Sequence, residues 1–217
     1  MFNNIYNRKK VLVIGHTGFK GSWLTLWLKQ LGADVAGFAN GIPTDPSLFE
    51  MMQIHNQIQD FREDIRNLKA LKFVFEQFKP DIVFHLAAKA IVRECYDEPV
   101  EAFETNVLGS VHVLECLRKA SSVKAAVMIT SDKCYENVEW EYGYRETDRL
   151  GGKDPYSASK ACAETAFSTY FRSYLNKRDN LNIATARAGN VIGGGDWARD
   201  RIVPDCIRAW QKGDDVI

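Results

Sequence analysis

The sequence VLVIGHTGFKG at residues 11–21 joins a short apolar run to three regularly spaced glycines. A run of four apolar residues bounded by charge and glycine is typical of a strand buried on both faces of a sheet. Gly15, Gly18 and Gly21 follow it and open a helical pattern. Glycines at this place permit a tight turn and let backbone N–H groups approach a pyrophosphate at the helix N-terminus. The segment therefore predicts a β-α unit that binds a dinucleotide.

The rest of the chain repeats this alternation of apolar runs and helical patterns. We expect a loop with two prolines at 40–47, and a final helix followed by the start of a strand in 202–217. Strands alternating with helices predict an α/β fold with a Rossmann-type, doubly wound parallel sheet. The other expected strands are 35–38, 82–85, 126–130 and 183–187, and the other expected helices are 22–31, 68–78, 100–120 and 157–174.

Composition narrows the class of partner. The 217 residues include 28 Lys+Arg and 28 Asp+Glu, so the formal net charge is zero. Nucleic-acid and anionic-membrane binding both require a basic excess on one face, so we expect neither partner. The apolar run at 11–14 is too short for a signal peptide or a membrane span, which favours the cytoplasm. An odd number of dispersed cysteines favours a reducing compartment and no metal site, the five being Cys95, Cys116, Cys134, Cys162 and Cys206.

A YSASK pattern at residues 156–160 lies at the start of an expected helix. Residues four apart share a helix face, so the Lys160 ammonium can stand near the Tyr156 phenol and lower the pKa of that phenol from about 10. A phenolate formed in this way is a usable base near neutral pH. The same spacing at Tyr6 and Lys10 lies in a polar tail, where we expect no such role.

Several motifs occur in a fixed order along the chain. They are the glycine pattern at 15–21, Glu63-Asp64-Ile65, His85-Leu86-Ala87-Ala88, Asn106, Thr130-Ser131-Asp132-Lys133-Cys134-Tyr135, and Tyr156 with Lys160. In this order they resemble the extended short-chain dehydrogenase/reductase family, and within it the nucleotide-sugar 4,6-dehydratases. Residues 15–23, 43–49 and 189–197 look in particular like the CDP-glucose subgroup. The resemblance covers essentially the whole chain.

The resemblance implies a site for NAD, with NADP not excluded. Residues 38–40 occupy the place that usually distinguishes the ribose 2′-hydroxyl of NAD from the 2′-phosphate of NADP. They include neither a carboxylate for the hydroxyl nor an arginine for the phosphate. Asp64 and Ile65 would meet the adenine, and Asn106 would support the active-site end of the Tyr156 helix. The plainer alternatives are a solvated carboxylate for Asp64 and a polar helix-face residue for Asn106. The cofactor-binding residues implied are Gly15, Thr17, Gly18, Phe19, Lys20, Gly21, Asp64, Ile65, Leu86, Ala87, Ala88, Lys89, Asn106, Tyr156 and Lys160.

The reaction implied is the hydro-lyase conversion of CDP-glucose to CDP-4-keto-6-deoxyglucose, with hydride leaving and returning through one cofactor. Tyr156 would take the proton of the 4-hydroxyl beside Ser131, and Asp132 would be the acid to the 6-hydroxyl. Lys133 replaces the glutamate base of the wider dehydratase group. It can be a base at C5 only if it is neutral. If it stays charged, it would stabilise the enolate or steer Asp132, and another group would take the C5 proton. The catalytic residues implied are Ser131, Asp132, Lys133, Tyr156 and Lys160.

The glycine-rich segment after residue 187 is expected to contact the substrate. Asn190, Arg199 and Arg201 suit a diphosphate, because guanidinium forks match phosphate oxygens. Ser131 completes the implied substrate-binding set. A flexible surface loop is the alternative for this segment. We expect residues 1–187 to form the NAD(P)-binding domain and residues 188–217 to begin a truncated substrate-binding domain, at a cost in turnover.

Two other functions remain open. A nucleotide-sugar 4-epimerase needs the glycine pattern, Tyr156 and Lys160 but no acid and base for elimination. A non-catalytic dinucleotide-binding module needs only the glycine pattern. The family resemblance also implies a homodimer built on the helices 100–120 and 157–174. An apolar stripe on the first of these helices would form the interface or ordinary core, its members being Val107, Val111, Leu114 and Leu117.

Three residues near the glycine pattern have plainer expected roles. His16 is expected to be a solvated loop histidine rather than a catalytic one. Trp23 and Trp27, at i and i+4, are expected in the core rather than in contact with cofactor.

Overall fold

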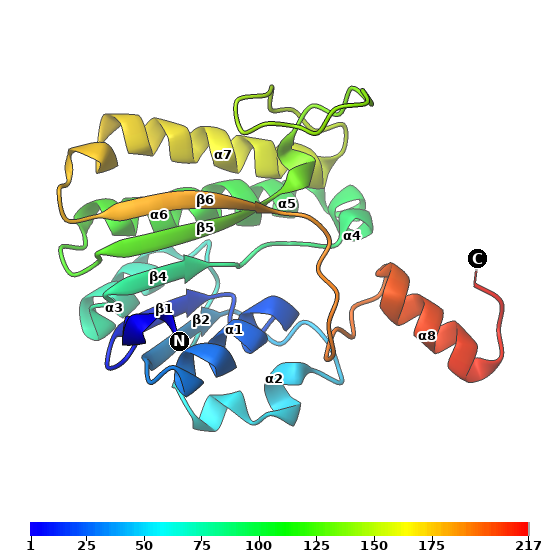
Figure 1. Ribbon diagram of the computed structural model, residues 1–217, viewed down its shortest axis with the longest axis horizontal. Helices are drawn as coiled ribbons and strands as arrows, with labels where there is room; N and C mark the ends of the chain where they lie inside the picture. Colours follow the sequence, from blue (N-terminus) through cyan, green and yellow to red (C-terminus); the bar gives the residue numbers. More distant parts are fainter. Residues whose placement is uncertain (217) are drawn as a thin grey trace.

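The computed structural model describes residues 1–216. Its centre is a six-stranded, fully parallel sheet with the strand order β3-β2-β1-β4-β5-β6 (Figure 1). This confirms the expected doubly wound sheet. The strands are β1 Lys10–Ile14, β2 Asp34–Ala39, β3 Gln59–Arg62, β4 Ile82–His85, β5 Ala125–Ser131 and β6 Asn182–Ala188.

The helices connect successive strands and lie on both faces of the sheet. A π-helical turn, η3 (Glu104–Leu108), joins α5 to α6, so the expected helix 100–120 is one helical stretch with a local irregularity. The helices are α1 Phe19–Gln30, α2 Leu48–Met51, α3 Leu68–Phe78, α4 Val92–Asp97, α5 Pro99–Phe103, α6 Gly109–Lys119, α7 Pro155–Ser173 and α8 Ile202–Lys212.

Three elements escape the sequence analysis: β3, α2 and α4. The strand β3 reads QDFR and buries neither end, so it shows no apolar run. The helices α2 and α4 have four and six residues, too few to display a 3.6-residue period. Short elements at the edge of a sheet or in a connection leave almost no pattern in sequence.

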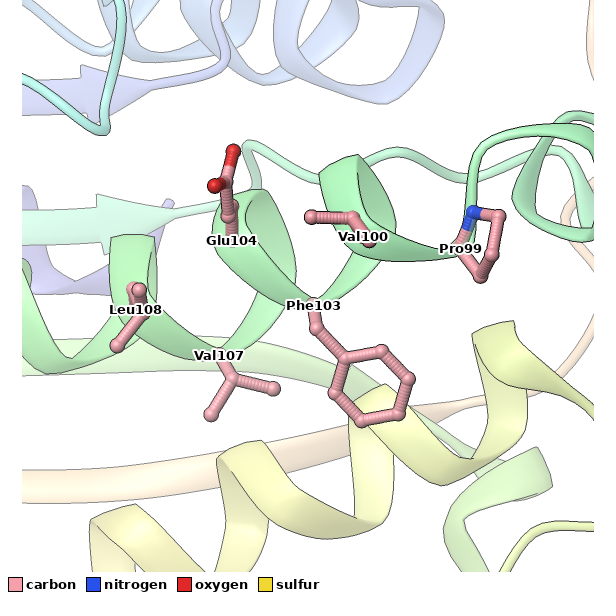
Figure 2. Close-up of a pocket in the computed structure, with 6 residues that line it drawn as sticks. All are labelled: Pro99, Val100, Phe103, Glu104, Val107 and Leu108. Carbon is pink, nitrogen blue, oxygen red and sulfur yellow. The ribbon is translucent and has the colours of Figure 1, made fainter.

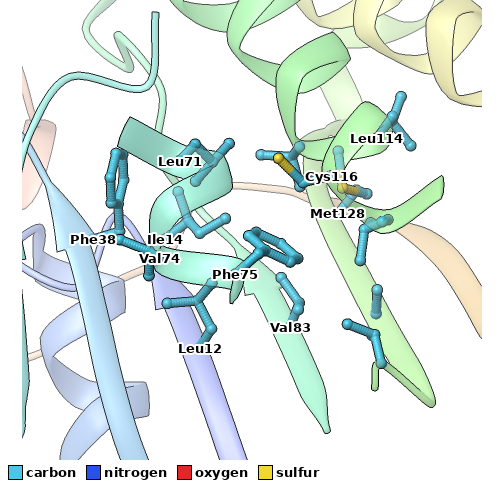
Figure 3. Close-up of a cluster of buried hydrophobic side chains, with 14 of the residues drawn as sticks. Leu12, Ile14, Phe38, Leu71, Val74, Phe75, Val83, Leu114, Cys116 and Met128 are labelled. Atoms are coloured by element: carbon cyan, nitrogen blue, oxygen red, sulfur yellow. The ribbon is translucent and has the colours of Figure 1, made fainter. Parts of the chain in front are cut away.

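Two apolar clusters cover the two faces of the sheet. The larger contains Ile14 of β1 and side chains of α3 and α6, such as Phe75 and Leu114 (Figure 3). The smaller contains Val11 and Val13 of β1 with Leu28 of α1. Because the central strand is buried on both faces, it reads as a continuous apolar run rather than as an alternation.

The helix α1 approaches the sheet through small side chains. Its buried residues are Gly21, Ser22, Thr25 and Leu28. Trp23 and Trp27 lie on the outer face and are 49% and 44% exposed. The expectation that this pair belongs to the core is therefore wrong, because close approach of α1 to β1 and β2 leaves no room for indoles between them.

His16 is fully buried, so the expectation of a solvated loop histidine is wrong. Its ring fills the space above Gly37 of β2, where a Cβ would lie 2.3 Å from the ring. Its Nε2 lies 2.8 Å from Oδ1 of Asp60 on β3, and Asp60 also accepts from Arg62. Burial lowers the pKa of His16 despite the Asp60 carboxylate. A neutral ring that donates to Asp60 fits this pocket.

The C-terminal helix α8 projects away from the sheet (Figure 1). Residues 213–216 form no strand, so the expected strand start is wrong for them. Residue 217 lies outside the described part of the chain. Within residues 1–216, none of the helices combines the length and apolar character needed to cross a bilayer.

Candidate active site

The carboxyl ends of β1, β4 and β5 bring the expected site residues to one edge of the sheet. Ile14 pairs with His85 in the register of β1 and β4, and β4 pairs in turn with β5. The segments that follow these strands therefore start side by side. In open parallel sheets this edge is where ligands bind.

The glycine segment forms a cradle at this edge. Gly15 has φ +91°, and a Cβ there would lie 2.5 Å from the backbone nitrogen of Ala87. A Cβ at Gly21 would lie 2.0 Å from the Gly15 carbonyl oxygen, so both glycines are required by close backbone approach. Gly18 is the N-cap of α1, and no side chain caps the helix. The first N–H groups of α1 are thus free of a side-chain acceptor beside an open glycine, which fits a dinucleotide phosphate.

Thr17 and Lys20, which alternate with the glycines of the cradle, fix its position and bring a basic side chain to it. The Thr17 hydroxyl donates to the Gly41 carbonyl over 2.6 Å, which ties the glycine segment to the loop after β2. Burial, with a further effect from the charge of Arg201, lowers the pKa of Lys20. Lys20 therefore brings a partly desolvated amine toward the same space as Arg201.

The expected adenine end lies beyond β2 and β3. Asp64 is held by Arg66, whose guanidinium nitrogen lies 2.7 Å from Oδ2, and this hydrogen bond lowers the pKa of Asp64. The Asn40 amide also approaches Oδ2 over 3.5 Å. The Ile65 side chain is buried against Gly109 of α6. Asp64 is thus half-exposed at the edge, whereas the Ile65 side chain is buried and its carbonyl oxygen lies 3.0 Å from Nδ1 of His112.

Asn106 organises the segment after β4. Its Oδ1 accepts from the Lys89 N–H over 2.8 Å, and its Nδ2 donates to the Lys89 carbonyl over 3.1 Å and to the Ser159 hydroxyl over 2.8 Å. The N–H groups of Leu86 and Ala87 both donate to the Ile14 carbonyl. Asn106 is 1% exposed on η3, so it joins the β4 segment to α7 from inside the protein. The expected support of the Tyr156 helix agrees with this geometry better than the plainer alternative of a helix-face residue.

Tyr156 and Lys160 lie on the first turns of α7, which Asp154 caps by accepting from the Ser157 N–H. Lys160 is 6% exposed, and its Nζ lies 3.5 Å from the Ile129 carbonyl. Burial, with a further effect from Lys20, lowers the pKa of Lys160 to about 8.

The expected lowering of the Tyr156 pKa is wrong for this structure. Burial raises the pKa of Tyr156, and it outweighs the opposing effects of the Ser131 hydroxyl and the Arg201 charge. The i, i+4 argument considered charge alone, whereas the phenol is also desolvated where it stands.

Ser131 ends β5 and caps a 3-10 turn, Asp132–Cys134, which holds Asp132 and Lys133. The Ser131 hydroxyl donates to Oδ1 of Asp132 over 3.1 Å and accepts from the Lys133 N–H over 3.2 Å. Ser131 is buried, whereas Asp132 and Lys133 are exposed. Lys133 is therefore not buried in the way that a neutral lysine base would require.

The three expected substrate residues after β6 separate in the structure. Asn190 and Arg199 are exposed. Arg201 is half-buried, and its Nε is buried without a hydrogen-bond partner among residues 1–216. Its charge acts on both Lys20 and Tyr156. The structure thus brings Arg201 close enough to Tyr156 for its charge to act there, and Asn190 follows Gly189, where a Cβ would lie 3.5 Å from Oδ2 of Asp132.

A buried carboxylate that the sequence analysis did not select lies one turn beyond Lys160. Glu164 is 4% exposed and accepts from Thr130 on β5, from Thr185 on β6 over 3.1 Å and from Arg187 over 3.0 Å. The Arg187 guanidinium also lies over the ring of Tyr135, 4.8 Å from its centroid. The signal was available, because residues 156, 160 and 164 share one helix face.

Comparison with known proteins places this site in a family. A model of the GDP-mannose 4,6 dehydratase family matches residues 12–190. The chain belongs to this family. It is 49% identical to the CDP-glucose 4,6-dehydratase of Salmonella typhimurium, over 99% of this chain and 61% of that protein. It is 32% identical to the UDP-glucose 4-epimerase of Yersinia enterocolitica, over 84% of this chain and 54% of that protein. The chain thus spans between half and two thirds of these relatives.

Solved structures of related enzymes share the fold of this dehydratase-family chain. The UDP-glucose 4-epimerase of Thermotoga maritima with UDP-glucose superposes with a TM-score of 0.83 at 25% identity, covering 95% of this chain and 64% of that one. The Thermus thermophilus UDP-glucose 4-epimerase complex with NAD gives 0.82 at 30% identity, with the same coverage. The expected family resemblance and Rossmann-type fold are confirmed.

Proposed function

We propose that this chain carries the catalytic residues of a nucleotide-sugar 4,6-dehydratase that converts CDP-glucose to CDP-4-keto-6-deoxyglucose. The observation that carries the proposal is that Tyr156 on α7 lies close to Ser131 and Asp132 at the end of β5. Lys160, one turn further along α7, lies close enough to Lys20 of the glycine cradle for their charges to interact. The 49% identity to a CDP-glucose 4,6-dehydratase supports the substrate. We also propose that residues 1–187 are the cofactor-binding domain and that residues 188–217 belong to the substrate-binding part.

NAD is the proposed cofactor. The cradle of Gly15, Gly18 and Gly21 at the uncapped start of α1 fits its diphosphate, and Lys20 adds positive charge there. Asp64 and the backbone of Ile65 are proposed to meet the adenine. When bound, the nicotinamide supplies the acceptor and later the donor of one hydride.

The residues around Tyr156 are proposed to handle the first proton. Tyr156 takes the proton of the sugar 4-hydroxyl, and the buried Ser131 hydroxyl orients that group. The pKa of Tyr156 is raised in this structure, so the phenol depends on cationic neighbours to act as a base near neutrality. Lys160 and Arg201 are the neighbours available. Arg201 is also proposed to contact the substrate diphosphate, with Asn190 and Arg199.

Asp132 and Lys133 are proposed to serve the elimination. Asp132 delivers a proton to the departing 6-hydroxyl, and its hydrogen bond with Ser131 keeps it beside the group that orients the 4-hydroxyl. Lys133 is proposed to act at C5 either as the base that takes the C5 proton or as the cation that stabilises the enolate, and in the second role another group takes that proton.

We expect the double variant Asp132→Asn with Lys133→Met to lose 4-keto-6-deoxy product by about 10²- to 10⁴-fold, because it removes both the acid to the 6-hydroxyl and the lysine that acts at C5. The product is a chromophore in alkali and is measured directly. The double variant should still oxidise the sugar at C4, seen as transient absorbance of reduced nicotinamide. Unchanged product formation would contradict these roles. A wild type that interconverts the C4 epimers without forming this product would point to the epimerase instead, a class of enzyme whose fold this chain shares.

A homodimer is the proposed assembly. Leu114 and Leu117 are fully buried, so the core alternative is confirmed for these two. The exposed apolar surface of this helical stretch lies further toward its N-terminus, beside α7 (Figure 2). The residues that line a pocket on this surface are Pro99, Val100, Phe103, Glu104, Val107 and Leu108.

We expect the wild type to sediment as a dimer at micromolar concentration and the double variant Val100→Glu with Leu108→Glu to sediment as a monomer. Val100 is 71% exposed and Leu108 is 51% exposed, so the new charges act at the surface and not in the core. Phe73→Glu on α3, which changes an equally exposed apolar residue elsewhere, is the control and should leave the dimer intact. A monomeric wild type would contradict the proposal.

A further inference from the structure

The glycines of the segment after β6 cross the carboxyl edge of the sheet. The strand β6 is the outermost strand on one side, whereas α1 and α2 cover β1 and β2 on the other. Residues 193–195 nevertheless lie against α1 and α2, and Figure 1 shows the chain running from β6 past the end of β4 to reach them. We call residues 193–195 the strap. The strap spans the edge at which the cradle and Tyr156 lie.

Trp23 holds the strap to α1. Its indole Nε1 donates to the Gly194 carbonyl over 2.8 Å. Among residues 1–216 this is the only hydrogen bond between α1 and the strap. Trp23 is half-exposed and contributes little to the core. Its specific contact is this hydrogen bond, which joins residues 171 positions apart in the sequence.

The strap lies close to its neighbours, and the backbone conformation of one of its residues favours glycine. A Cβ at Gly193 would lie 3.0 Å from the ring of Phe19. Gly195 has φ +83°, and a Cβ there would lie 3.0 Å from Leu48 of α2. These contacts favour a strap that rests on α1 and α2 over the alternative of a flexible surface loop.

The strap determines where the next residues go. Arg201 follows it and brings its charge to Lys20 and Tyr156, with its Nε buried. Other contacts hold this region as well. Asp200 pairs with Arg93 at 3.1 Å, but the Arg93 side chain is 81% exposed, and an ion pair so exposed contributes little. Arg208 donates to the Trp197 and Ala198 carbonyls, which ties the region to α8 and not to the sheet. The hydrogen bond of Trp23 is the contact that ties the strap to α1.

We propose that Trp23 is a positioning residue that latches the strap across the carboxyl edge of the sheet, so that Arg201 is placed at the site and bound dinucleotide is retained. The retention part rests on the proposed function, in which one cofactor must stay bound through both hydride transfers. The latch itself depends only on contacts within this chain and does not require a bound cofactor.

Trp23→Phe tests the latch, because phenylalanine keeps the apolar contact and removes the N–H. Trp27→Phe is the matched control, since Trp27 lies one turn away on the same outer face and contacts Phe2 instead of the strap. Under native conditions, we expect trypsin to cleave Trp23→Phe after Arg199 and Arg201 roughly three- to ten-fold faster than it cleaves the wild type or the control. This factor corresponds to the loss of one hydrogen bond. Mass spectrometry of the fragments gives the rates.

Gly195→Ala is the second variant and should accelerate the same cleavages without touching the indole. Cleavage of both variants at the wild-type rate would overturn the latch, and so would an equal acceleration in Trp27→Phe. In the retention test, reduced dinucleotide should dissociate roughly three- to ten-fold faster from Trp23→Phe, measured by the fluorescence change when excess oxidised dinucleotide displaces it. A wild type that binds no dinucleotide would overturn the proposed function and the retention part, whereas the cleavage rates would still decide the latch.

Discussion

Replacing Lys160 with methionine is expected to abolish turnover while making the fold more stable at neutral pH. Lys160 is 6% exposed, and burial lowers its pKa from an ordinary value of 10.5 to about 8. That shift measures how strongly the folded protein disfavours the charged amine. Methionine has a similar length and no charge, so we expect the free energy of unfolding at pH 7 to rise by about 1–3 kcal/mol. Turnover should fall by about 10²- to 10⁴-fold.

The pH dependence of this stability difference has a definite sign. Below pH 8 the lysine is protonated in both the folded and the unfolded protein, so the wild type carries the full cost of burying the charge. Between about pH 8 and 10.5 the folded protein has released the proton and the unfolded protein still holds it, so the wild type gains stability as pH rises. The advantage of Lys160→Met should therefore be constant below pH 8 and shrink across this window.

Urea unfolding of both proteins at pH 6, 7, 9 and 10 measures the difference. Lys153→Met is the control, because Lys153 is exposed just before α7 and should change stability by less than about 0.5 kcal/mol. A Lys160→Met protein that is less stable than the wild type at pH 7 would mean that the ammonium is stabilised by groups other than those near it in this structure.

Replacing Glu164 with alanine is expected to have the largest effect on stability. The carboxylate is 4% exposed and is shared by Thr130, Thr185 and Arg187, which come from β5 and β6. Its removal leaves the Arg187 guanidinium, itself mostly buried, without its counter-ion. Losing one partner of such a pair typically costs about 3–5 kcal/mol, and we expect about 3 kcal/mol here.

Glu115→Ala provides the matched control for Glu164→Ala. Glu115 also pairs with an arginine, Arg118, but that arginine is 36% exposed on the surface of α6. Its loss should cost less than about 1 kcal/mol. Denaturant midpoints of the two variants give the comparison. Equal losses of stability would show that the Glu164 network is no stronger than a surface ion pair.

Most of the sheet could be predicted from sequence. The runs at 11–14, 35–38 and 82–85 are apolar because both faces of these central strands are covered, and the helices between them show a clear period. The strand β3 could not be predicted in this way. It lies at the edge of the sheet, where Asp60 hydrogen-bonds to His16 and to Arg62 of the same strand instead of packing into the core.

In the candidate site, too, some residues could be predicted from the sequence and others could not. Gly15, Gly21, Tyr156 and Lys160 were predictable, because each role depends on a spacing of at most six residues in the chain. Trp23, by contrast, was assigned to the core, because periodicity cannot tell which side of a helix meets a sheet through small residues. The direction of the Tyr156 pKa shift was also missed, because the burial that causes it depends on distant segments.

The sequence by itself thus determined the α/β class, the position of the dinucleotide cradle and the tyrosine–lysine pair, because these depend on local spacing and on the two-sided burial of short strands. Only the tertiary structure decided that His16 is buried on Asp60, that Glu164 joins α7 to β5 and β6, and that Trp23 reaches the strap. Each of these contacts joins residues 21 to 171 positions apart. No local pattern encodes such a contact, since it exists only when the folded sheet brings both partners to one place.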